Sequence, residues 1–551
     1  MDVILRGAEV VDGTGSPARA VSVGIEGGTI AAVGDIGPAT PGAKEAEVVD
    51  LDGLVLSPGF VDIHTHYDAQ VLWDPDLTPS SWHGVTTVVV GNCGFGIAPT
   101  RPEHRETIAR TLENVEGMSV EALVAGIPWT FETFPEYLDA LDAIPTRLNL
   151  GALIGHTPLR LYVLGDEAVE RPASADEIAR MRGLVADAIH AGAVGFATSQ
   201  SPTHTGAAGR PVPSRLAEPA EIFEIADALR EAGRGIVQVT PGPGFFVNQL
   251  AELSERTGRP VSWTALLTGI MGPATKVLER QAGLGGEVWP QIACRPLVMQ
   301  VSLADPFPFA SAASFKEILA LPRDQRAGLY ADPAWRQRAR QDVGGVWGNR
   351  WNKTTIQETA KFSEWRNGPT LVELAASRDT DPFDLLIDLS LEEDLATRFR
   401  IVLANDDEED LADLLRDGRA VLGLSDAGAH ASQLCDACYS THLLEHWVRD
   451  LGVLSLEQAV WRLSGHAAQV FRLEGRGQIA PGYAADLVAF DADAVGVEDL
   501  ERVWDLPAGA DRLIARSRGV EAVWVNGQPA RRGGRDLPGA RNGVLIRGGG
   551  S

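Results

Sequence analysis

Two histidines, His64 and His66, stand one residue apart shortly after an apolar segment, residues 54–61. If that segment is a strand, side chains two positions apart point the same way, so both imidazoles can reach one cation. Far along the chain a second apolar segment, residues 420–425, is followed by Asp426, which can add a carboxylate. The three side chains predict a metal site, and the alternative is a hydrogen-bonded histidine pair in the core.

Cys93 ends a third apolar segment, residues 86–93, and we expect its thiolate to be a further ligand. Zinc accepts nitrogen, sulfur and oxygen donors in tetrahedral geometry, and a catalytic zinc site keeps one position for water. Three firm ligands plus water therefore suit a catalytic site better than four, with Asp426 loosely bound. The alternative for Cys93 is a small buried apolar side chain.

A second group of potential ligands, Cys435, Cys438, His442 and His446, has the spacing of one face of a helix. Such a stripe runs about 16 Å along a straight helix, so four donors cannot surround one ion. We therefore interpret it as a packed helix face, in which a pair of these residues binds a metal weakly at most.

Eight strand-like segments alternate with helical patterns such as residues 177–190. This alternation is typical of a (β/α)8 TIM-like barrel, an α/β fold in which polar side chains at the carboxyl ends of strands share one face. The predicted strands are residues 54–61, 86–93, 148–156, 193–198, 235–240, 260–264, 296–301 and 420–425.

Both ends of the chain, residues 1–55 and 478–546, contain short strands and tight turns instead. Neither end has enough strands for a stable sheet, so we expect them to combine into one small, discontinuous β-sandwich domain. The barrel is then assigned to residues 56–477, and residues 547–551 resemble a linker remnant.

A long insertion at about residues 304–400 separates the last two predicted strands. Long segments on the loop face can cap a pocket, and they can also form a satellite core of their own. Both interpretations stay open for its four tryptophans, which are Trp335, Trp347, Trp351 and Trp365.

The composition of the 551 residues, 44% hydrophobic and 22% charged, is that of an ordinary globular protein. A formal net charge of -27 disfavours nucleic acids and anionic membranes as partners and leaves a small molecule as the expected one. We find neither a signal peptide nor a membrane-spanning apolar segment, so a cytoplasmic location is expected. Four cysteines argue against a disulfide framework. A homo-oligomer is left open.

The chain resembles the amidohydrolase superfamily and, within it, the N-acyl-D-amino-acid deacylase (D-aminoacylase) family. The resemblance covers nearly the whole chain, and an Asn-Cys-Gly segment stands where many superfamily members have a bridging lysine. It implies a metal-dependent amide hydrolase with a barrel and a composite β-sandwich. The matching segments are residues 58–68, 91–96, 155–160, 192–198, 425–428 and 479–488.

One departure from the family concerns the ends of the fifth and sixth strands, where the family has histidine ligands. This chain has Thr240 and Thr264 there, and neutral threonine is a poor ligand for a borderline cation. Either one zinc ion binds instead of two, or a nearby residue such as His204 substitutes, or the site is degenerate. We expect one zinc ion rather than two.

In an amide hydrolase we expect Asp426 to take the proton of water and to pass it to the leaving amine. His156 is expected to polarise the scissile carbonyl, and Arg160 to bind a substrate carboxylate, with capping of their loop as the alternative. His430 is assigned to the substrate-binding residues and can orient Asp426; the alternative is a solvent-facing loop position.

We therefore expect hydrolysis of an amide C–N bond in a small substrate, with N-acyl amino acids of D configuration as the leading class. Hydrolysis of a cyclic amide or imide is a second hypothesis for an enzyme, because a fold alone does not determine the substrate. A non-catalytic binding or scaffolding protein that has lost its metal is the third, motivated by Thr240 and Thr264.

Overall fold

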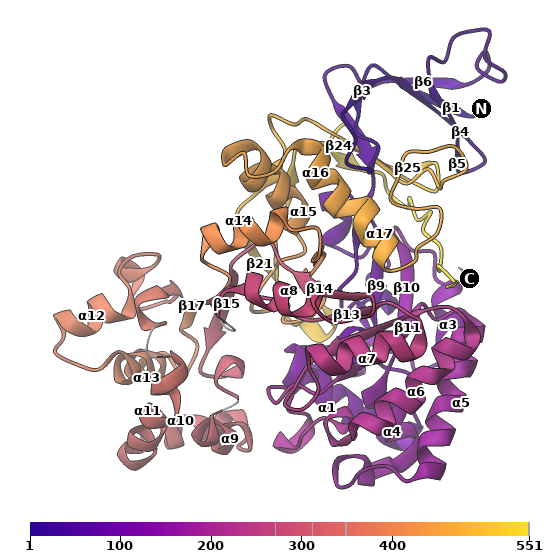
Figure 1. Ribbon diagram of the computed structural model, residues 1–551. Helices are drawn as coiled ribbons and strands as arrows, with labels where there is room; N and C mark the ends of the chain where they lie inside the picture. Colours follow the sequence, from indigo (N-terminus) through magenta and orange to yellow (C-terminus); the bar gives the residue numbers. More distant parts are fainter. Residues whose placement is uncertain (270–271, 311, 348–349, 549–551) are drawn as a thin grey trace.

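An eight-stranded parallel sheet forms the centre of the protein, whose computed structural model describes residues 1–269, 272–310, 312–347 and 350–548 (Figure 1). Past the strand ends, Thr65 and Ala427 form a parallel bridge, so the first and last strands approach each other at the carboxyl edge. The order is that of a TIM-type fold. It runs β8 (Phe60–Asp62), β9 (Val85–Val90), β10 (Asn149–Gly155), β11 (Gly195–Ser199), β12 (Ile236–Thr240), β13 (Val261–Trp263), β14 (Val288–Ile292) and β18 (Val421–Leu422).

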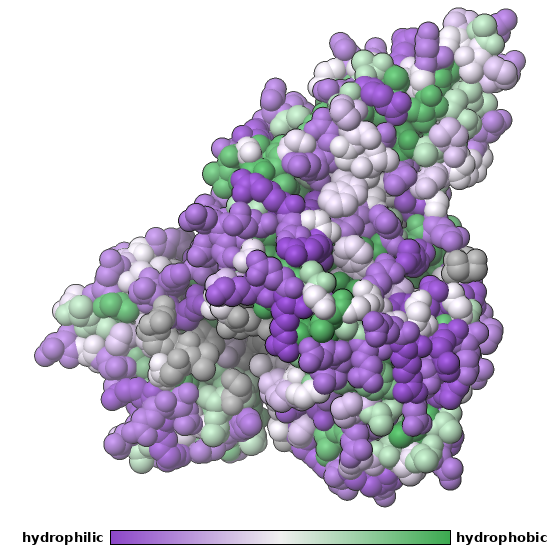
Figure 2. Space-filling model, viewed as in Figure 1, coloured by the Kyte–Doolittle hydropathy of each residue, from purple (hydrophilic) through white to green (hydrophobic). Residues whose placement is uncertain are grey.

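Helices alternate with these strands and cover the sheet. The helix predicted at residues 177–190 lies within α5 (Ala175–Ala191), which begins with a capping box between Ser174 and Glu177. Hydrophilic residues cover much of the visible face over these helices (Figure 2), as expected when each buries one apolar side. The others are α1 (Arg105–Glu116), α2 (Val120–Gly126), α3 (Phe134–Asp142), α4 (His156–Leu164), α6 (Pro219–Ala232), α7 (Val247–Thr257), α8 (Ala274–Ala282) and α14 (Glu408–Arg416).

After the last strand the chain returns through further helical segments. The final turn, α17, and the preceding π-helical turn contact β8 and β18. The segments are α15 (Tyr439–His442), the π-helical Leu443–Asp450, α16 (Leu456–Val460), the π-helical Trp461–His466 and α17 (Ala467–Val470). None of the described helices combines the length and the apolar character needed to cross a lipid bilayer.

The prediction of the seventh strand of the central sheet is wrong. It is β14, whereas the predicted residues 296–301 lie in β15 (Leu297–Ser302), part of a separate antiparallel sheet. Pro290 within β14 argued against a central strand, because proline lacks the backbone N–H that a ladder uses.

The separate sheet, in the order β15-β17-β16, starts the insertion, which forms a lobe beside the central sheet. Trp335 and Trp351 belong to its own hydrophobic cluster and Trp365 packs against that cluster, which favours the satellite core; the side chain of Trp347 lies outside the described residues. The remaining elements of the lobe are α9 (Ala313–Leu319), α10 (Arg323–Tyr330), α11 (Pro333–Trp347), β16 (Thr354–Glu358), α12 (Leu371–Ser377), α13 (Pro382–Glu392) and β17 (Arg398–Ala404).

Strands from both ends of the chain share one sheet of seven strands, because β19 pairs with β7 on one side and β24 on the other. A hydrophobic cluster joins this sheet, for example through Trp524, to a four-stranded sheet that contributes Leu5. The seven strands are β26 (Arg535–Asp536), β25 (Gln528–Arg532), β24 (Val520–Val525), β19 (Leu487–Phe490), β7 (Val55–Pro58), β2 (Glu9–Val10) and β3 (Arg19–Ala20). The four are β5 (Thr29–Gly34), β4 (Ser22–Glu26), β1 (Val3–Arg6) and β6 (Glu47–Asp50).

Two short strand pairs and the final residues complete the fold. The pairs are β20 (Gly496–Val497) with β23 (Ser517–Arg518), and β21 (Glu501–Val503) with β22 (Arg512–Ile514). At the end of the chain, Arg547 Nη1 and the backbone N–H of Gly548 donate to carbonyls of residues 191 and 192. The domain boundaries and the interpretation of residues 547–551 as a linker remnant stay predictions, and residues 549–551 lie outside the described part of the chain.

Candidate metal centre

The tips of β8 and β18 are tied together by hydrogen bonds. Asp62, the last residue of β8, accepts the hydroxyl of Ser425 at 2.6 Å and the backbone N–H of His64 at 3.3 Å. Ser425 also accepts the backbone N–H of Ala427 at 3.0 Å. These contacts fix the backbone on both sides of the site and bring Asp426 next to the histidines.

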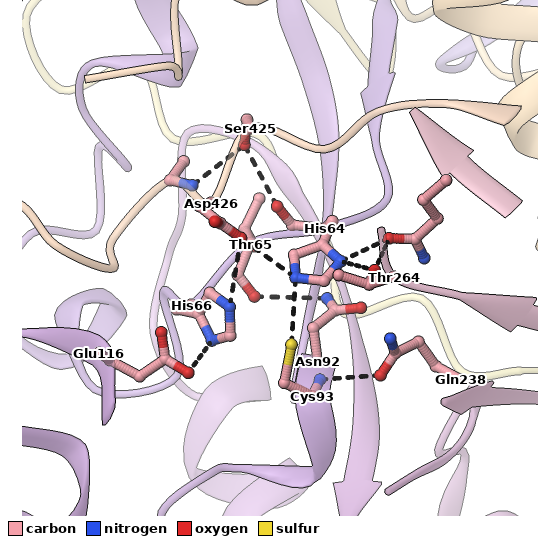
Figure 3. Close-up of polar contacts among 12 residues, drawn as sticks. His64, Thr65, His66, Asn92, Cys93, Glu116, Gln238, Thr264, Ser425 and Asp426 are labelled. Atoms are coloured by element: carbon pink, nitrogen blue, oxygen red, sulfur yellow. Dashed lines mark hydrogen bonds and ion pairs between the residues drawn. The ribbon is translucent and has the colours of Figure 1, made fainter. Parts of the chain in front are cut away.

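Four side chains that the sequence predicts as ligands meet at this point (Figure 3). His64 Nε2 lies 3.2 Å from Asp426 Oδ1 and 3.5 Å from Cys93 Sγ. His66 Nε2 lies 3.7 Å from the same Asp426 oxygen. The donor atoms of His64, His66 and Cys93 all lie within 4.8 Å of one another.

These distances fit a tetrahedral ion. With bonds of about 2.0–2.1 Å to nitrogen and about 2.3 Å to sulfur, neighbouring donors around zinc stand about 3.3–3.6 Å apart. The three measured separations of 3.2, 3.5 and 3.7 Å fall around that range. His64, His66 and Cys93 are buried, whereas the side chain of Asp426 is 30% exposed, so the site is open on the side of the carboxylate.

The hydrogen bonds on the outer ring nitrogens turn the inner nitrogens toward the centre. His64 Nδ1 lies 2.5 Å from Gln291 Oε1, which can only accept, so Nδ1 carries the hydrogen and Nε2 presents its lone pair. His66 Nδ1 lies 3.5 Å from a carboxylate oxygen of Glu116, which selects the same tautomer. In both rings Nε2 is therefore the nitrogen that faces the metal position, and a bound ion takes the place of any proton on it.

The electrostatics of the cluster favour positive charge at its centre. Burial would lower the pKa of His64, but the thiolate of Cys93 and the carboxylate of Asp426 outweigh burial and raise it to about 10. Burial would raise the pKa of Cys93, but His64 outweighs that effect and lowers it to about 6. A group of residues that stabilises protons in this way also suits a cation, which displaces those protons when it binds.

A cavity of about 430 Å³ adjoins this centre. Gly117, next to Glu116, and Gly428, two residues after Asp426, are among its lining residues. The insertion contributes others, including Arg323 and Arg398. A substrate in this cavity can therefore touch both the insertion and the region of Asp426.

Comparison with known proteins identifies the family. The model of the amidohydrolase family matches residues 47–295 and 384–531, which together exceed half of the chain. The chain belongs to the amidohydrolase family. The relatives narrow this further: the amidohydrolase is 31% identical to a D-aminoacylase of Alcaligenes xylosoxydans xylosoxydans over 96% of its own length and 94% of that protein.

Solved structures agree with this family. A D-aminoacylase studied for its binuclear metal centre has a TM-score of 0.69 at 27% identity, covering 99% of this chain and 100% of that one. The N-acyl-D-glutamate deacylase of Bordetella bronchiseptica, complexed with zinc and a phosphonate inhibitor, has a TM-score of 0.68 at 26% identity, covering 99% of each chain. The amidohydrolase is thus a member of the D-aminoacylase family, a metal-dependent hydrolase of amide C–N bonds.

The two threonines at the ends of β12 and β13 differ in their hydrogen bonds. Thr264 Oγ1 lies 3.0 Å from His64 Nδ1 and donates to Gln291, so it supports a ligand. Thr240 is buried, and its hydroxyl has no hydrogen-bond partner among the described residues. Within that part of the chain, His64, His66 and Cys93 form the one group of His, Cys, Asp or Glu side chains whose donors converge.

His156 and Arg160 do not join this centre in the amidohydrolase. His156 Nδ1 lies 2.8 Å from the hydroxyl of Thr198 and its Nε2 3.0 Å from Glu221 Oε1. Arg160 pairs with the same Glu221, and its Nη2 donates to the carbonyl of residue 171. Both side chains are fully buried, so the predicted contacts with substrate do not match this geometry, and the structural alternative fits it better.

His430 lies beside the centre, as its sequence position suggested. Its backbone N–H donates to the carbonyl of Glu116, which fixes this loop against the end of α1. The residue is 9% exposed, so the solvent-facing alternative does not apply. Its assignment to orient Asp426 and to bind substrate stays a prediction.

The second group of potential ligands makes packing contacts, as interpreted, but its four residues do not lie on one continuous helix. Cys435 and Cys438 precede α15 rather than continue it. Cys438 accepts a hydrogen bond from Arg295, and the rings of His442 and His446 stack with centroids 5.1 Å apart.

Sequence reasoning missed three residues that support the ligands. Glu116 ends α1 and contacts His66, Gln291 in the overlooked β14 contacts His64, and Gln238 in β12 accepts the backbone N–H of Cys93 at 2.8 Å. A signal existed for the two glutamines, because each is a polar residue inside a buried apolar strand, where it needs a partner.

Proposed function

We propose that this amidohydrolase removes the acyl group from N-acyl amino acids of D configuration. The convergence of His64, His66 and Cys93, with Asp426 3.2 Å from His64 and a cavity of about 430 Å³ nearby, carries the proposal. The substrate class is suggested by the relatives, whose names include D-aminoacylase and N-acyl-D-glutamate deacylase.

The metal that fits these residues is zinc, held by His64, His66 and Cys93 with Asp426 more loosely. A zinc ion supplies a nucleophile at neutral pH by lowering the pKa of water from about 15.7 to about 7. Asp426, whose side chain is 30% exposed, accepts one proton of the attacking water as its oxygen bonds to the acyl carbon. The same carboxyl then protonates the departing nitrogen as the C–N bond breaks, so a carboxylic acid and an amine leave.

One zinc ion rather than two is proposed for this chain. A second ion needs its own donors, and the fifth and sixth strands end in Thr240 and Thr264. Neutral threonine is a weak ligand for zinc, and the hydroxyl of Thr264 is already hydrogen-bonded to Gln291.

The amino-acid part of the substrate is placed in the cavity beside the insertion. With Arg160 paired to Glu221, the guanidinium groups of the cavity wall are those of Arg323, Arg326 and Arg398, of which Arg323 and Arg398 are proposed to bind a substrate carboxylate because Arg326 donates to the carbonyls of residues 304 and 321. Both also contact acidic side chains, Asp305 and Asp511, so substrate binding involves exchange of ion-pair partners.

The test is a hydrolysis assay on paired N-acetyl-D- and N-acetyl-L-amino acids, following amine release, with metal per chain measured on the same preparation. We expect release from the D series only, with about one zinc per chain. Turnover of a cyclic imide but of neither acyl series would contradict the proposed substrate, and about two ions per chain would contradict the single site.

A further inference from the structure

His204 lies in the segment that follows β11. Its ring packs on Phe95, two residues after Cys93, with centroids 5.1 Å apart and planes tilted by 56°. The next residue, Thr205, lines the cavity beside the candidate metal centre, so His204 lies between that cavity and the loop that carries Cys93. Its donor atoms are not part of the converging ligand group.

Hydrogen bonding assigns the tautomer of this ring. Ser199 Oγ lies 2.6 Å from His204 Nδ1, and the same oxygen accepts the backbone N–H of Ser201 at 3.2 Å. The Ser199 hydroxyl hydrogen then points at Nδ1, because no other acceptor for it is found in the described part of the chain. His204 therefore carries its own hydrogen on Nε2.

The remaining nitrogen of His204 is available to a ligand. Nε2 has no hydrogen-bond partner in the described ranges, whereas the backbone is well held. The carbonyl of His204 accepts a hydrogen bond from Arg215 at 3.0 Å, and its N–H donates to the carbonyl of Ser201 at 3.2 Å. Burial also lowers the pKa of His204 to about 3, so the ring is neutral at working pH.

We propose that His204 donates a hydrogen bond from Nε2 to the scissile carbonyl oxygen and to the oxyanion that forms from it. This is the role expected of His156, which the structure places in a closed cluster with Glu221. The proposal rests on the amide hydrolysis proposed above. A fixed neutral donor stabilises an oxyanion without giving up its proton.

In the same tautomer His204 is not a substitute metal ligand. An imidazole binds a metal through a lone pair, and here the Nδ1 lone pair accepts the Ser199 hydroxyl while Nε2 bears the hydrogen. The two roles therefore make opposite predictions for the metal content of a variant.

The experiment uses the full zinc-loaded chain and the variants His204→Ala, His204→Gln and Ser199→Ala. For His204→Ala we expect kcat to fall about 10²–10³-fold, as for loss of one oxyanion donor, with metal per chain unchanged. Affinity for a phosphonate analogue of the substrate, which imitates the tetrahedral state, should fall by a similar factor while KM changes little. His204→Gln keeps an N–H donor and should recover part of kcat.

Ser199→Ala tests positioning, and it should lower kcat less than His204→Ala. His190→Ala, an exposed histidine on α5, is the matched control and should leave kcat unchanged. If His204→Ala is unfolded by thermal melting, the decision passes to His204→Phe, which keeps an aromatic ring but has no N–H donor; a wild-type affinity for the phosphonate together with unchanged kcat in that variant overturns the proposal. So does loss of zinc with the activity. A wild-type chain that hydrolyses no acyl amino acid instead refutes the proposed function itself.

Discussion

Two buried clusters of this molecule contain the same kinds of residue and differ in charge balance. At the end of β10, Glu221 is matched by Arg160 and by a histidine that burial keeps neutral, His156. At the ends of β8 and β18, one thiolate and the carboxylates of Asp426 and Glu116 surround two histidines. In the first cluster a guanidinium is paired with the carboxylate, whereas in the second the acidic groups face only histidines, whose protons a metal ion can displace.

The comparison teaches that a buried histidine next to a carboxylate does not by itself mark a reactive site. What distinguishes the candidate metal centre is the absence of a guanidinium among its described contacts and the exposure of one donor, since the side chain of Asp426 is 30% exposed while that of Glu221 is 2% exposed. A cation completes one cluster, and the other is already complete.

The largest effect is expected from Asp426→Asn. Asparagine keeps the shape but cannot accept a proton, so kcat should fall about 10²–10⁴-fold with little change in melting temperature. Asp187→Asn, an exposed carboxylate on α5, is the control and should keep full activity. Undiminished turnover of Asp426→Asn would show that another group moves the proton.

Glu221→Gln is expected to act on stability instead. It leaves the buried guanidinium of Arg160 without its carboxylate, and breaking a buried pair in this way costs about 3–5 kcal/mol of unfolding free energy. Denaturant unfolding measures the loss, and Glu224→Gln, exposed on the same helix, should show none. Zinc per chain should stay at the wild-type value; a selective loss of zinc would mean that the two clusters are not independent.

Glu116→Gln is expected to weaken zinc binding by about 10–100-fold, because the carboxylate that orients His66 is lost. Competition with a chelator of known affinity gives the ratio. Glu106→Gln, on the exposed side of the same α1, is the matched variant and should bind zinc as the wild type does. Equal affinities for the two variants would remove Glu116 from the metal centre.

The smallest expected effect is on the pH dependence of the unfolding free energy, and it arises in the cluster of His156, Arg160 and Glu221. Burial lowers the pKa of His156 below its ordinary value of about 6.5, so the unfolded chain binds more protons just below that pH. The stability contributed by neutral His156 is therefore full above about pH 6.5 and is lost as the pH falls further. Unfolding free energies at pH 7.5 and 5.5 should differ less in His156→Gln than in the wild type. An equal difference would contradict a buried neutral imidazole.

Much of the centre was visible in the sequence, because its ligands are distinctive residue types at the ends of apolar strands. His64, His66, Cys93 and Asp426 were found in this way, and the structure brings them together. The family was recognisable from the same segments and is confirmed by the family match.

The parts of the site that the sequence did not reveal depend on contacts between distant segments, which no local sequence pattern indicates. Because proline is unusual in a central strand, Pro290 argued against β14, so neither β14 nor Gln291, the partner of His64, was predicted. The contact of His156 with Glu221 was not predicted, because Glu221 lies 65 positions further along the chain. Sequence spacing indicates that a side chain is near a strand end, and only packing decides whether it faces the cavity or the helices.

The hydrogen bond between Asp62 and Ser425 spans 363 positions of the chain. Asp426, which that bond holds in place, is therefore synthesised long after His64 and His66. The four side chains therefore come together only after most of the chain has left the ribosome, and the carboxylate proposed to move the proton is the last of them to be made. An incomplete chain that ends before residue 426 keeps His64, His66 and Cys93 but lacks this carboxylate, so we expect it to be inactive even where it binds a metal ion.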